Sequence, residues 1–353
     1  MKYSIIVPVY NRPDEVDELL QSLTEQELKD FEVVIVEDGS QKPCKDVCDK
    51  FADILDLHYY VKENGGPGQA RNYGAERAHG EWLIILDSDV VLPKGYLKAV
   101  EDGLRGERRE ERGEFAAFGG PDASHPSFTP VQKAISYSMT SFFTTGGIRG
   151  GKKKLDKFYP RSFNMGIRSD VYQQLGGFSK MRFGEDIDFS YRIVEAGYNP
   201  QLIPDAWVWH KRRTDFRKFF RQVYNSGIAR INLEKRHPGT LKLVHLLPMV
   251  FTVGVIALIL IAAVARAMIH YDAANWHTWY WICLLALSPI LFYSLIIFID
   301  SSIKNKSLKV GLLSVPAAFV QLMGYGFGFI ESWWKRCVMK KDEFQAFEKN
   351  FYK

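Results

Sequence analysis

The sequence contains little cysteine and little excess charge. Its four cysteines, Cys44, Cys48, Cys283 and Cys337, do not follow the spacing of a zinc site or of a disulfide framework. The 46 basic and 41 acidic residues give a net charge of +5, and no zinc-finger, basic-zipper or RNA-binding signature accompanies them. We therefore expect ordinary thiols in a reducing compartment and no nucleic-acid partner.

The N-terminus shows no secretory signal pattern, because Met1–Tyr3 lead directly into a short apolar run without a cleavage site. The composition changes near residue 240, where a polar region gives way to a strongly apolar one. This change predicts an α/β domain over residues 1–213, an amphipathic basic interface segment over 214–240, a transmembrane region over 241–331 and a basic tail over 332–353.

Long runs without charge lie within the apolar region, at about 243–265, 277–299 and 310–330. Each is close to the roughly 20 residues that cross a hydrocarbon core. Aromatic residues around Trp279 lie near one end of the second run, as at a membrane interface. Three membrane spans are the first interpretation, and buried core helices are the alternative.

The topology of these spans is left open by two conflicting signals. Three spans would place the tail on the side opposite the N-terminal domain, whereas basic tail residues favour the cytoplasmic side. These residues are Lys335, Arg336, Lys340 and Lys341. Pro316 and three nearby glycines make a re-entrant third segment the alternative.

The segment just before the apolar region mixes aromatic and basic residues. Phe216–Arg236 alternates side chains such as Phe219 and Phe220 with Arg217 and Arg221. This pattern is typical of a helix in the plane of a membrane interface, and an ordinary amphipathic core helix is the alternative.

The N-terminal region alternates short apolar runs with amphipathic segments. The pattern predicts strands over 4–9, 31–36, 57–61, 82–86 and 115–119 and helices over 13–23 and 69–79. Such alternation indicates an α/β fold with a mostly parallel sheet flanked by helices.

Two carboxylates follow the apolar run 82–86. Asp87 and Asp89 are separated by Ser88, and ligands of open α/β sheets bind outside the carboxyl ends of the strands. Two hard oxygen ligands suit Mg²⁺ or Mn²⁺ shared with substrate phosphates. A solvated turn is the alternative for this triplet taken by itself.

Further short motifs occur in a fixed order along the chain. They are Pro8–Asn11, Val36–Ser40, Gly68–Asn72, Asp87–Asp89, Glu185–Asp188 and Trp209–His210. Over roughly residues 3–230 this order and spacing resemble family 2 glycosyltransferases, in particular membrane-anchored bacterial members. The resemblance implies the GT-A nucleotide-diphospho-sugar transferase fold, followed here by the C-terminal helical transmembrane region.

The resemblance also implies a donor site. Pro8, Tyr10 and Asp38 would line the nucleotide pocket, although Asp38 in Asp-Gly-Ser also suits a turn cap. Arg71 would lie near the diphosphate, with a surface ion pair as the alternative. Asp87 would contact ribose, sugar or metal through water.

The same resemblance places a divalent cation, Mn²⁺ or Mg²⁺, on Asp89, with His210 as an additional ligand or as a packed structural residue. Asp186 is our choice for the general base of an inverting displacement. Glu185 and Asp188 are its rivals, and acidity at a helix start is favourable by itself. Glu185 and Asn164 are expected to contact substrate.

One departure from the family bears on the product. Processive members carry Gln-x-x-Arg-Trp after the base, whereas Gln222 is followed here by Asn225 and Ser226. We therefore expect transfer of one sugar, with a UDP-sugar favoured, to a lipid-linked glycan acceptor of envelope polysaccharide synthesis. The expected location is the bacterial inner membrane, multi-pass, with the catalytic domain facing the cytoplasm. A processive synthase and a non-catalytic binding protein are the alternatives.

Overall fold

The computed structural model describes residues 1–106, 114–125, 127–145, 158–181 and 183–344. The chain forms two compact units. The first contains Met1–Pro126 and Lys152–Lys211, and the second contains Ser127–Gly151 and Arg212–Lys353. Each unit is described separately below.

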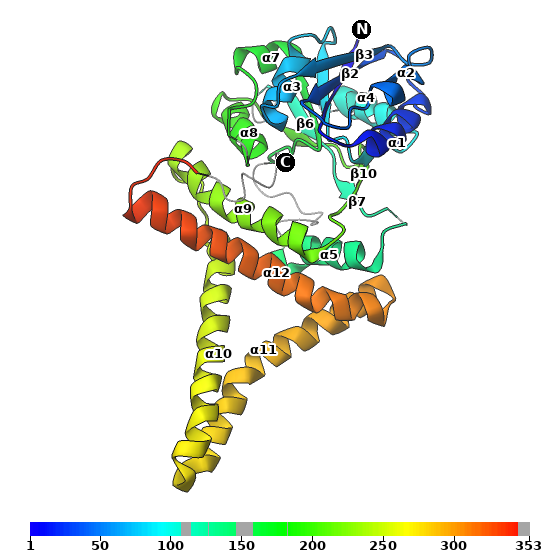
Figure 1. Cartoon of the computed structure of the whole chain (residues 1–353). Coiled ribbons are helices and arrows are strands. Elements are labelled where there is room, and N and C mark those ends of the chain that lie inside the picture. Colours follow the sequence, from blue (N-terminus) through cyan, green and yellow to red (C-terminus); the bar gives the residue numbers. More distant parts are fainter. Residues whose placement is uncertain (107–113, 126, 146–157, 182, 345–353) are drawn as a thin grey trace. The chain divides into compact units, whose positions relative to one another are not determined.

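The first unit is built on a seven-stranded sheet with the order β3-β2-β1-β4-β8-β6-β9 (Figure 1). Four of its strands are parallel, namely β1 (Tyr3–Val9), β2 (Phe31–Asp38), β3 (Leu57–Lys62) and β4 (Trp82–Leu86). Strand β8 (Asn164–Arg168) runs antiparallel to both β4 and β6 (Ala117–Gly119), and β9 (Gln201–Leu202) is parallel to β6.

A small second sheet completes this unit. Its order is β5-β10-β7, formed by β5 (Val90–Val91), β10 (Val208–His210) and β7 (Asp122–Ala123). Strand β10 is antiparallel to β5 and parallel to β7. This pairing brings His210, which is distant in sequence, beside the residues that follow β4.

Helices cover both faces of the large sheet because successive strand residues point to opposite faces. Ile5 packs with α1 (Pro13–Thr24), α2 (Lys45–Asp49) and α4 (Tyr96–Gly106). Ile6 packs with the other face's helices, α3 (Pro67–Ala75), α7 (Ser169–Gln174) and α8 (Glu185–Glu195). The predicted mixed fold with a mostly parallel, helix-flanked sheet is confirmed.

The four N-terminal strands lie where the sequence predicts them, β6 begins two residues later than predicted, and α3 and β8 differ further. Helix α3 begins at Pro67, earlier than predicted, because Gly66 with φ +88° turns the chain into Pro67 at the first helical turn. The helix ends at Ala75, before the predicted end at His79. Strand β8 was not predicted. Its central Gly166 lies against the Phe118 ring, where an added Cβ would be 1.9 Å from a ring carbon, so this strand lacks the usual apolar signature.

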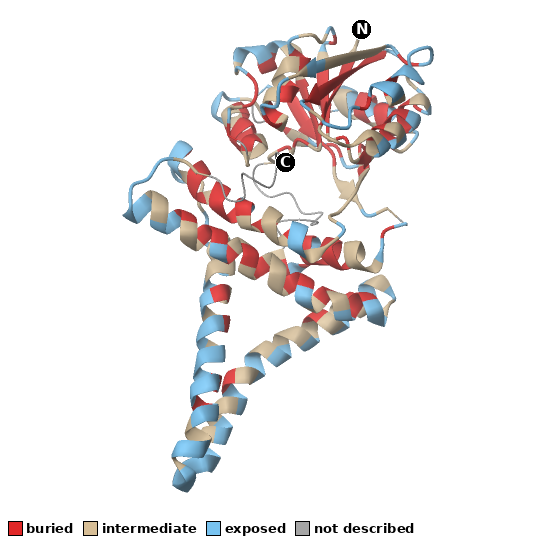
Figure 2. Cartoon of the chain, in the orientation of Figure 1, coloured by how far each residue is buried: buried red, intermediate tan, exposed pale blue. Residues whose placement is uncertain are grey.

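The second unit is helical. Helix α9 (Phe216–Arg236) lies within the amphipathic segment predicted over 214–240, and it packs beside α12 (Leu308–Trp333) (Figure 1). Helix α5 (Pro130–Thr140) contacts both, and the four-residue α6 (Phe142–Thr145) follows it. Helices α10 (Leu247–Tyr271) and α11 (Trp276–Asn305) form a hairpin whose surface is largely exposed (Figure 2).

Short helical turns connect these elements: 3₁₀ turns at Leu243–His245 and Ala273–Asn275, and a π turn at Trp334–Val338. Segment 127–151 belongs to this unit, whereas the sequence-based division assigns it to the domain over residues 1–213. The apolar side chains of α5 account for this, because Ala134 clusters with Ala317 of α12 and Ile135 with Phe219 of α9.

Within the described residues, three helical stretches are long and apolar enough to cross a membrane. They are Leu243–Tyr271, Ala273–Asn305 and Leu308–Val338. Their most apolar windows are 17%, 11% and 44% buried within the protein, respectively. Residues 345–353 of the predicted basic tail lie outside the described part of the chain.

Candidate active site

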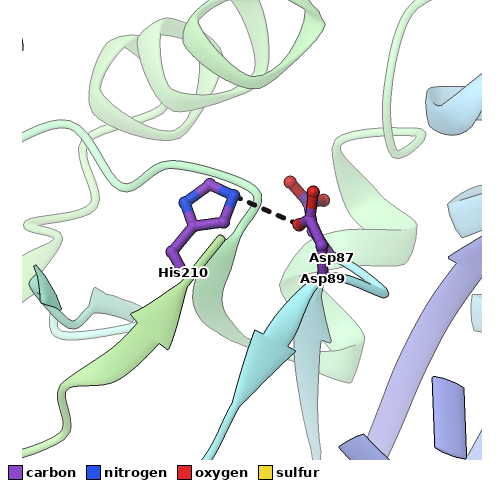
Figure 3. A group of neighbouring side chains, drawn as sticks. All are labelled: Asp87, Asp89 and His210. Carbon is purple, nitrogen blue, oxygen red and sulfur yellow. Dashed lines mark ion pairs between the residues drawn. The ribbon is translucent and has the colours of Figure 1, made fainter. Parts of the chain in front are cut away.

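The carboxyl end of β4 brings two carboxylates and an imidazole together (Figure 3). Asp87 follows β4, Asp89 precedes β5, and His210 ends β10, where it pairs with Val90. Ligand atoms from the three side chains all lie within 4.8 Å of one another. The cluster therefore arises from strand pairing rather than from sequence proximity.

The imidazole of His210 is held with one nitrogen toward the carboxylates. Its Nε2 is 3.2 Å from Asp89 Oδ1, and its Nδ1 is 3.9 Å from Asp122 Oδ2. The ring stacks on Phe163, with 4.9 Å between centroids and 23° between planes. Packing and ligation are therefore compatible for this residue, because the stacked ring still presents Nε2 to the cluster.

Arg12 was not identified from the sequence. It lies in the loop between β1 and α1, and its Nη1 is 2.8 Å from Asp89 Oδ2. The two oxygens of Asp89 thus face different partners, Arg12 on one side and His210 on the other. The only sequence signal is its position directly after the Pro8–Asn11 motif, since the pairing joins residues 77 positions apart.

Arg71 links three elements of the site. From α3, its Nη2 is 2.7 Å from Asp87 Oδ1 and its Nη1 is 3.0 Å from Glu185 Oε1 at the start of α8. The side chain is only 4% exposed, so it is not the surface ion pair considered from the sequence. Burial disfavours its charge, but the two carboxylates outweigh that effect and raise the pKa of the guanidinium.

The start of α8 carries two carboxyl groups in different environments. Gly184, with φ +86°, caps the helix, and Glu185 then points to Arg71. Burial raises the pKa of Glu185 to about 7, although Arg71 acts in the opposite direction. Burial also opposes ionisation of Asp186, but Arg161, 2.8 Å away, and Arg71 outweigh it and lower the pKa of that carboxyl.

Asp188, one of the rival carboxylates, is held within its own helix. Its side chain is 4% exposed, and its Oδ2 accepts a hydrogen bond from Arg192 Nε at 3.1 Å. The side chain of Asp186 is 13% exposed, the largest fraction among the three acidic residues of this helix start. Asp186 is therefore the most solvent-exposed of these three carboxylates.

Asp38 closes a turn at the end of β2. Its carboxylate accepts hydrogen bonds from the backbone N–H groups of Gly65 at 2.9 Å and Gly66 at 2.8 Å, and from Lys62 Nζ at 2.7 Å. These are the contacts expected of the turn-cap alternative. Pro8 is buried within β1, and Tyr10 is partly exposed just after that strand.

Asn164 pairs with Leu86 of β4, directly before Asp87, but its side chain is held in the protein interior. The residue is fully buried, its Oδ1 accepts a hydrogen bond from Tyr96 at 2.6 Å, and its Nδ2 donates to the Ala206 carbonyl at 2.8 Å. Both ends of the amide are thus used to connect β8 with α4 and with the segment before β10. We leave Asn164 out of the site proposed below.

Comparison with known proteins identifies the family. The model "Glycosyl transferase family 2" matches residues 4–109, and "Glycosyl transferase family group 2" matches residues 82–297, which is more than half of the chain. The chain belongs to glycosyltransferase family 2. The Asp87–Asp89–His210 cluster lies within the second matched region.

Curated relatives of this family 2 chain carry glycosyltransferase names. It is 39% identical over 102 residues to the poly(ribitol-phosphate) beta-N-acetylglucosaminyltransferase TarS of Staphylococcus aureus, covering 28% of this chain but only 18% of TarS. It is 26% identical over 240 residues to the glycosyltransferase AglE of Haloferax volcanii, covering 65% of this chain and 73% of AglE. The pre-mycofactocin glycosyltransferase of Mycobacterium tuberculosis is 26% identical over 257 residues, which is 67% of this chain and 48% of that protein.

A solved structure shows the same fold. The mannosyltransferase PcManGT of Pyrobaculum calidifontis superimposes with a TM-score of 0.55 and 15% sequence identity, over 95% of this chain and 88% of that one. The similarity supports the GT-A fold assigned to the first unit.

Proposed function

We propose that this chain is an inverting glycosyltransferase that moves one sugar from a nucleotide-sugar to a membrane-held, lipid-linked glycan acceptor in envelope polysaccharide synthesis. The convergence of Asp87, Asp89 and His210 beyond β4 carries the proposal, because ligands of α/β sheets bind at this end of the strands. A UDP-sugar is the favoured donor, and GDP-sugars are tested beside it because PcManGT was solved with GDP-Man and Mn²⁺.

The cluster fits a divalent cation. Two carboxylates and one imidazole are suitable ligands for Mn²⁺ or Mg²⁺, and their ligand atoms are close enough to share one ion. Asp89 and His210 would hold it, with Asp87 reaching it directly or through water. Such an ion, when bound, neutralises charge on the leaving diphosphate. Arg12 and Arg71 orient Asp89 and Asp87, respectively.

Asp186 is the proposed general base. Arg161 keeps its carboxylate ionised at neutral pH, which a proton acceptor requires. Asp186 takes the proton of the acceptor hydroxyl, the oxygen attacks the anomeric carbon, and the bond to the nucleoside diphosphate breaks with inversion. Glu185, in contrast, is held by Arg71 and serves to fix the start of α8.

The remaining sequence-predicted contacts complete the donor pocket. Pro8 and Tyr10 lie at the carboxyl end of β1, which is next to β4, and Asp38 lies at that of β2, the strand beyond β1, so a nucleoside would extend from the cluster along this edge. Asp38 acts there chiefly by fixing the Gly65–Gly66 turn. The missing Arg-Trp pair after Gln222 favours a single transfer over processive synthesis.

The test measures donor binding and turnover by the detergent-purified full chain, with UDP- and GDP-sugars, Mn²⁺ or Mg²⁺, and a membrane lipid extract as acceptor source. Asp89→Ala should abolish metal-dependent donor binding. Asp186→Asn should keep donor binding and lose at least about 100-fold in turnover, the usual scale of general-base catalysis. The exposed Asp53, changed to Ala or Asn, is the matched control and should leave both unchanged.

Each result has a definite meaning. Full activity of Asp186→Asn would refute the base assignment. Equal donor binding with and without cation would refute the metal site. Failure of the wild-type chain to bind any donor would favour the non-catalytic alternative, and repeated addition of sugar to one acceptor would favour a processive synthase.

A further inference from the structure

We infer that only two of the three apolar helices, α10 and α11, cross the bilayer, whereas α12 lies along the membrane interface beside α9. The chain after α12 then returns to the side of the membrane on which α10 begins. This topology rests on the second unit by itself and does not depend on the catalytic proposal.

Helix α9 is charged along its whole length and is therefore not a membrane span. Its charged residues occur in both its first and last turns and between them: Arg217, Lys218, Arg221, Arg230, Glu234, Lys235 and Arg236. Charges within a hydrocarbon core are costly, at about 2.5 to 3.5 kcal/mol each for Arg or Lys at the centre of a span. Apolar residues on its other face, such as Phe219 and Ile228, are buried in the protein.

Helix α12 is fixed to α9 over most of its length, and the two helices run in the same direction (Figure 1). Near their starts, Phe216 packs in the cluster that contains Ala317. Near their ends, Ser332 Oγ donates a hydrogen bond to the Ile228 carbonyl at 3.2 Å. The contacts thus run from the first turn of α9 to Ile228 in its second half, and two helices packed side by side over this length lie at a similar depth. If α9 lies in the membrane interface, α12, which packs beside it, lies there as well.

Glycines explain how closely the two helices approach. An added Cβ at Gly328 would lie 2.0 Å from the Tyr224 carbonyl oxygen, and one at Gly324 would lie 2.6 Å from a Val223 methyl carbon. From the α9 side, a Cβ at Gly227 would lie 2.2 Å from the Tyr325 carbonyl oxygen. These glycines are packing positions of a continuous helix.

The remaining hairpin has the features of a complete double crossing. Helix α10 has 25 residues, which at 1.5 Å per residue extend about 37 Å, more than the hydrocarbon core. Its lateral surface exposes large apolar side chains such as Leu260, and α11 similarly exposes Leu285 and Phe292. The connecting turn is flanked by exposed Tyr271 and Trp276, residue types that favour a membrane–water interface.

Basic residues distinguish the two ends of the hairpin. Lys242 precedes α10, and Lys304, Lys306 and Lys309 lie around the end of α11, whereas Arg266 is the basic residue near the turn. The positive-inside rule therefore places the open end of the hairpin in the cytoplasm. With α12 in the interface, Lys335, Arg336, Lys340 and Lys341 lie on that same side, which removes the conflict noted from the sequence.

Labelling of single cysteines with a membrane-impermeant maleimide tests the topology in the full chain. Cys337 is exposed just after α12, and Cys44 and Cys48 are buried, so Cys283→Ser leaves Cys337 as the native reporter. In the Cys283→Ser/Cys337→Ser variant, Lys218→Cys reports on α9 and Asn275→Cys on the hairpin turn. The variant without added cysteine gives the background.

Cys337 and Lys218→Cys should be labelled in inverted membrane vesicles and protected in sealed spheroplasts, whereas Asn275→Cys should show the opposite pattern. Labelling of Cys337 together with Asn275→Cys in spheroplasts would mean that α12 spans the membrane and would overturn the inference. Protection of Asn275→Cys on both sides would overturn the double crossing. Neither result requires turnover, so each is distinct from failure of the proposed function.

Spin labels provide a second readout. Leu312 and Phe327 are exposed on α12 and are separated by 15 residues. Labels at Leu312→Cys and Phe327→Cys in the same cysteine background should have similar depths in a bilayer. A difference near the roughly 22 Å rise of 15 helical residues would instead show a spanning α12.

Discussion

Every residue of strand β1 in the first unit is buried, whereas helix α10 of the second unit leaves Val250, Val253 and Ile259 about half exposed. The charged groups show the reverse arrangement. Arg71 of the first unit is 4% exposed between two carboxylates, and most basic residues of α9 are at least partly exposed. Apolar side chains thus lie in the interior of the first unit and on the surface of α10 in the second.

The difference shows how burial should be interpreted in each unit. Apolar contact stabilises the first unit, and a charged side chain buried there needs a partner of opposite charge, as Arg71 has in Asp87 and Glu185. In the second unit, we propose that the exposed apolar surface of α10 and α11 contacts the bilayer. Glycines allow the close contact between α9 and α12.

Arg71→Met should lower the free energy of unfolding of the first unit by about 3–5 kcal/mol, because it leaves buried Glu185 without its cation. Denaturation followed by hydrogen–deuterium exchange of β4 peptides measures this change. Arg105→Met is the control, since Arg105 is 74% exposed and its ion pair with Glu101 should contribute less than about 1 kcal/mol. An equal loss of unfolding free energy in both variants would show that the buried ion pair contributes no more to stability than the surface one.

An identical substitution in both units gives the next largest contrast. Ile85→Ala in β4 should cost about 2–5 kcal/mol, because Ile85 is fully buried in the sheet core. Ile259→Ala in α10 should stay within about 0.5 kcal/mol in detergent, since that side chain is 50% exposed. A large cost at Ile259 would indicate that its face of α10 packs against protein rather than lipid.

Gly328→Leu should destabilise the second unit by about 1–3 kcal/mol, because its added side chain meets the backbone of α9. Gly254→Leu is the matched control in α10, where an added Cβ has no neighbour within 4 Å. Thermal unfolding in detergent, followed through the α9 and α12 peptides, should show lower stability for Gly328→Leu than for Gly254→Leu. If Gly328→Leu were tolerated as well as Gly254→Leu, the close contact of α9 with α12 would be wrong.

The smallest effect concerns a paired carboxylate in the first unit. Hydrogen bonds from Lys2 Nζ and Tyr3 Oη, each at 2.6 Å, lower the pKa of Glu101. Its folded pKa is below the unfolded one, so the stabilisation is complete above about pH 4.5 and is lost as the pH falls through the folded pKa.

Glu101→Gln should therefore cost about 1 kcal/mol at pH 7, and the cost should diminish in acid. Denaturation of both proteins at several pH values measures the difference. Glu27→Gln, at a 57% exposed position, should show no such pH dependence. A constant difference between wild type and Glu101→Gln at all pH values would contradict the assignment to ionisation.

The sequence was sufficient for those features that depend on local pattern. The four parallel strands were predicted because each is a short apolar run bounded by turns, and α9 lies within the amphipathic segment predicted over 214–240. In the structure, Asp215 caps that helix by accepting a hydrogen bond from Lys218 N at 2.7 Å. The order of motifs was sufficient to identify the family and to propose Asp87, Asp89 and His210 as neighbours.

Features that depend on distant contacts were not predictable in this way. Arg12 pairs with Asp89 and Arg161 pairs with Asp186, which lies in the first turn of α8. Both arginines lie in loops, where an arginine has no distinguishing local pattern. Asn164 was expected to contact substrate, whereas its side chain links β8 to α4 and to the segment before β10. Pro316 and the glycines of α12 suggested a re-entrant segment as the alternative, whereas α12 is one continuous helix whose glycines permit close packing.

The assignment of α5 to the second unit has a consequence for synthesis of the chain. Thr140, its last residue, and Leu308, the first residue of α12, are 168 positions apart. At about 5–20 residues per second, a ribosome needs roughly 8 to 34 s to make the intervening segment. The first unit can complete its sheet as soon as Lys211 has emerged, while the apolar side chains of α5 that pack on α12 still await their partner. A chaperone or the nascent-chain insertion machinery therefore has a defined interval in which to bind α5.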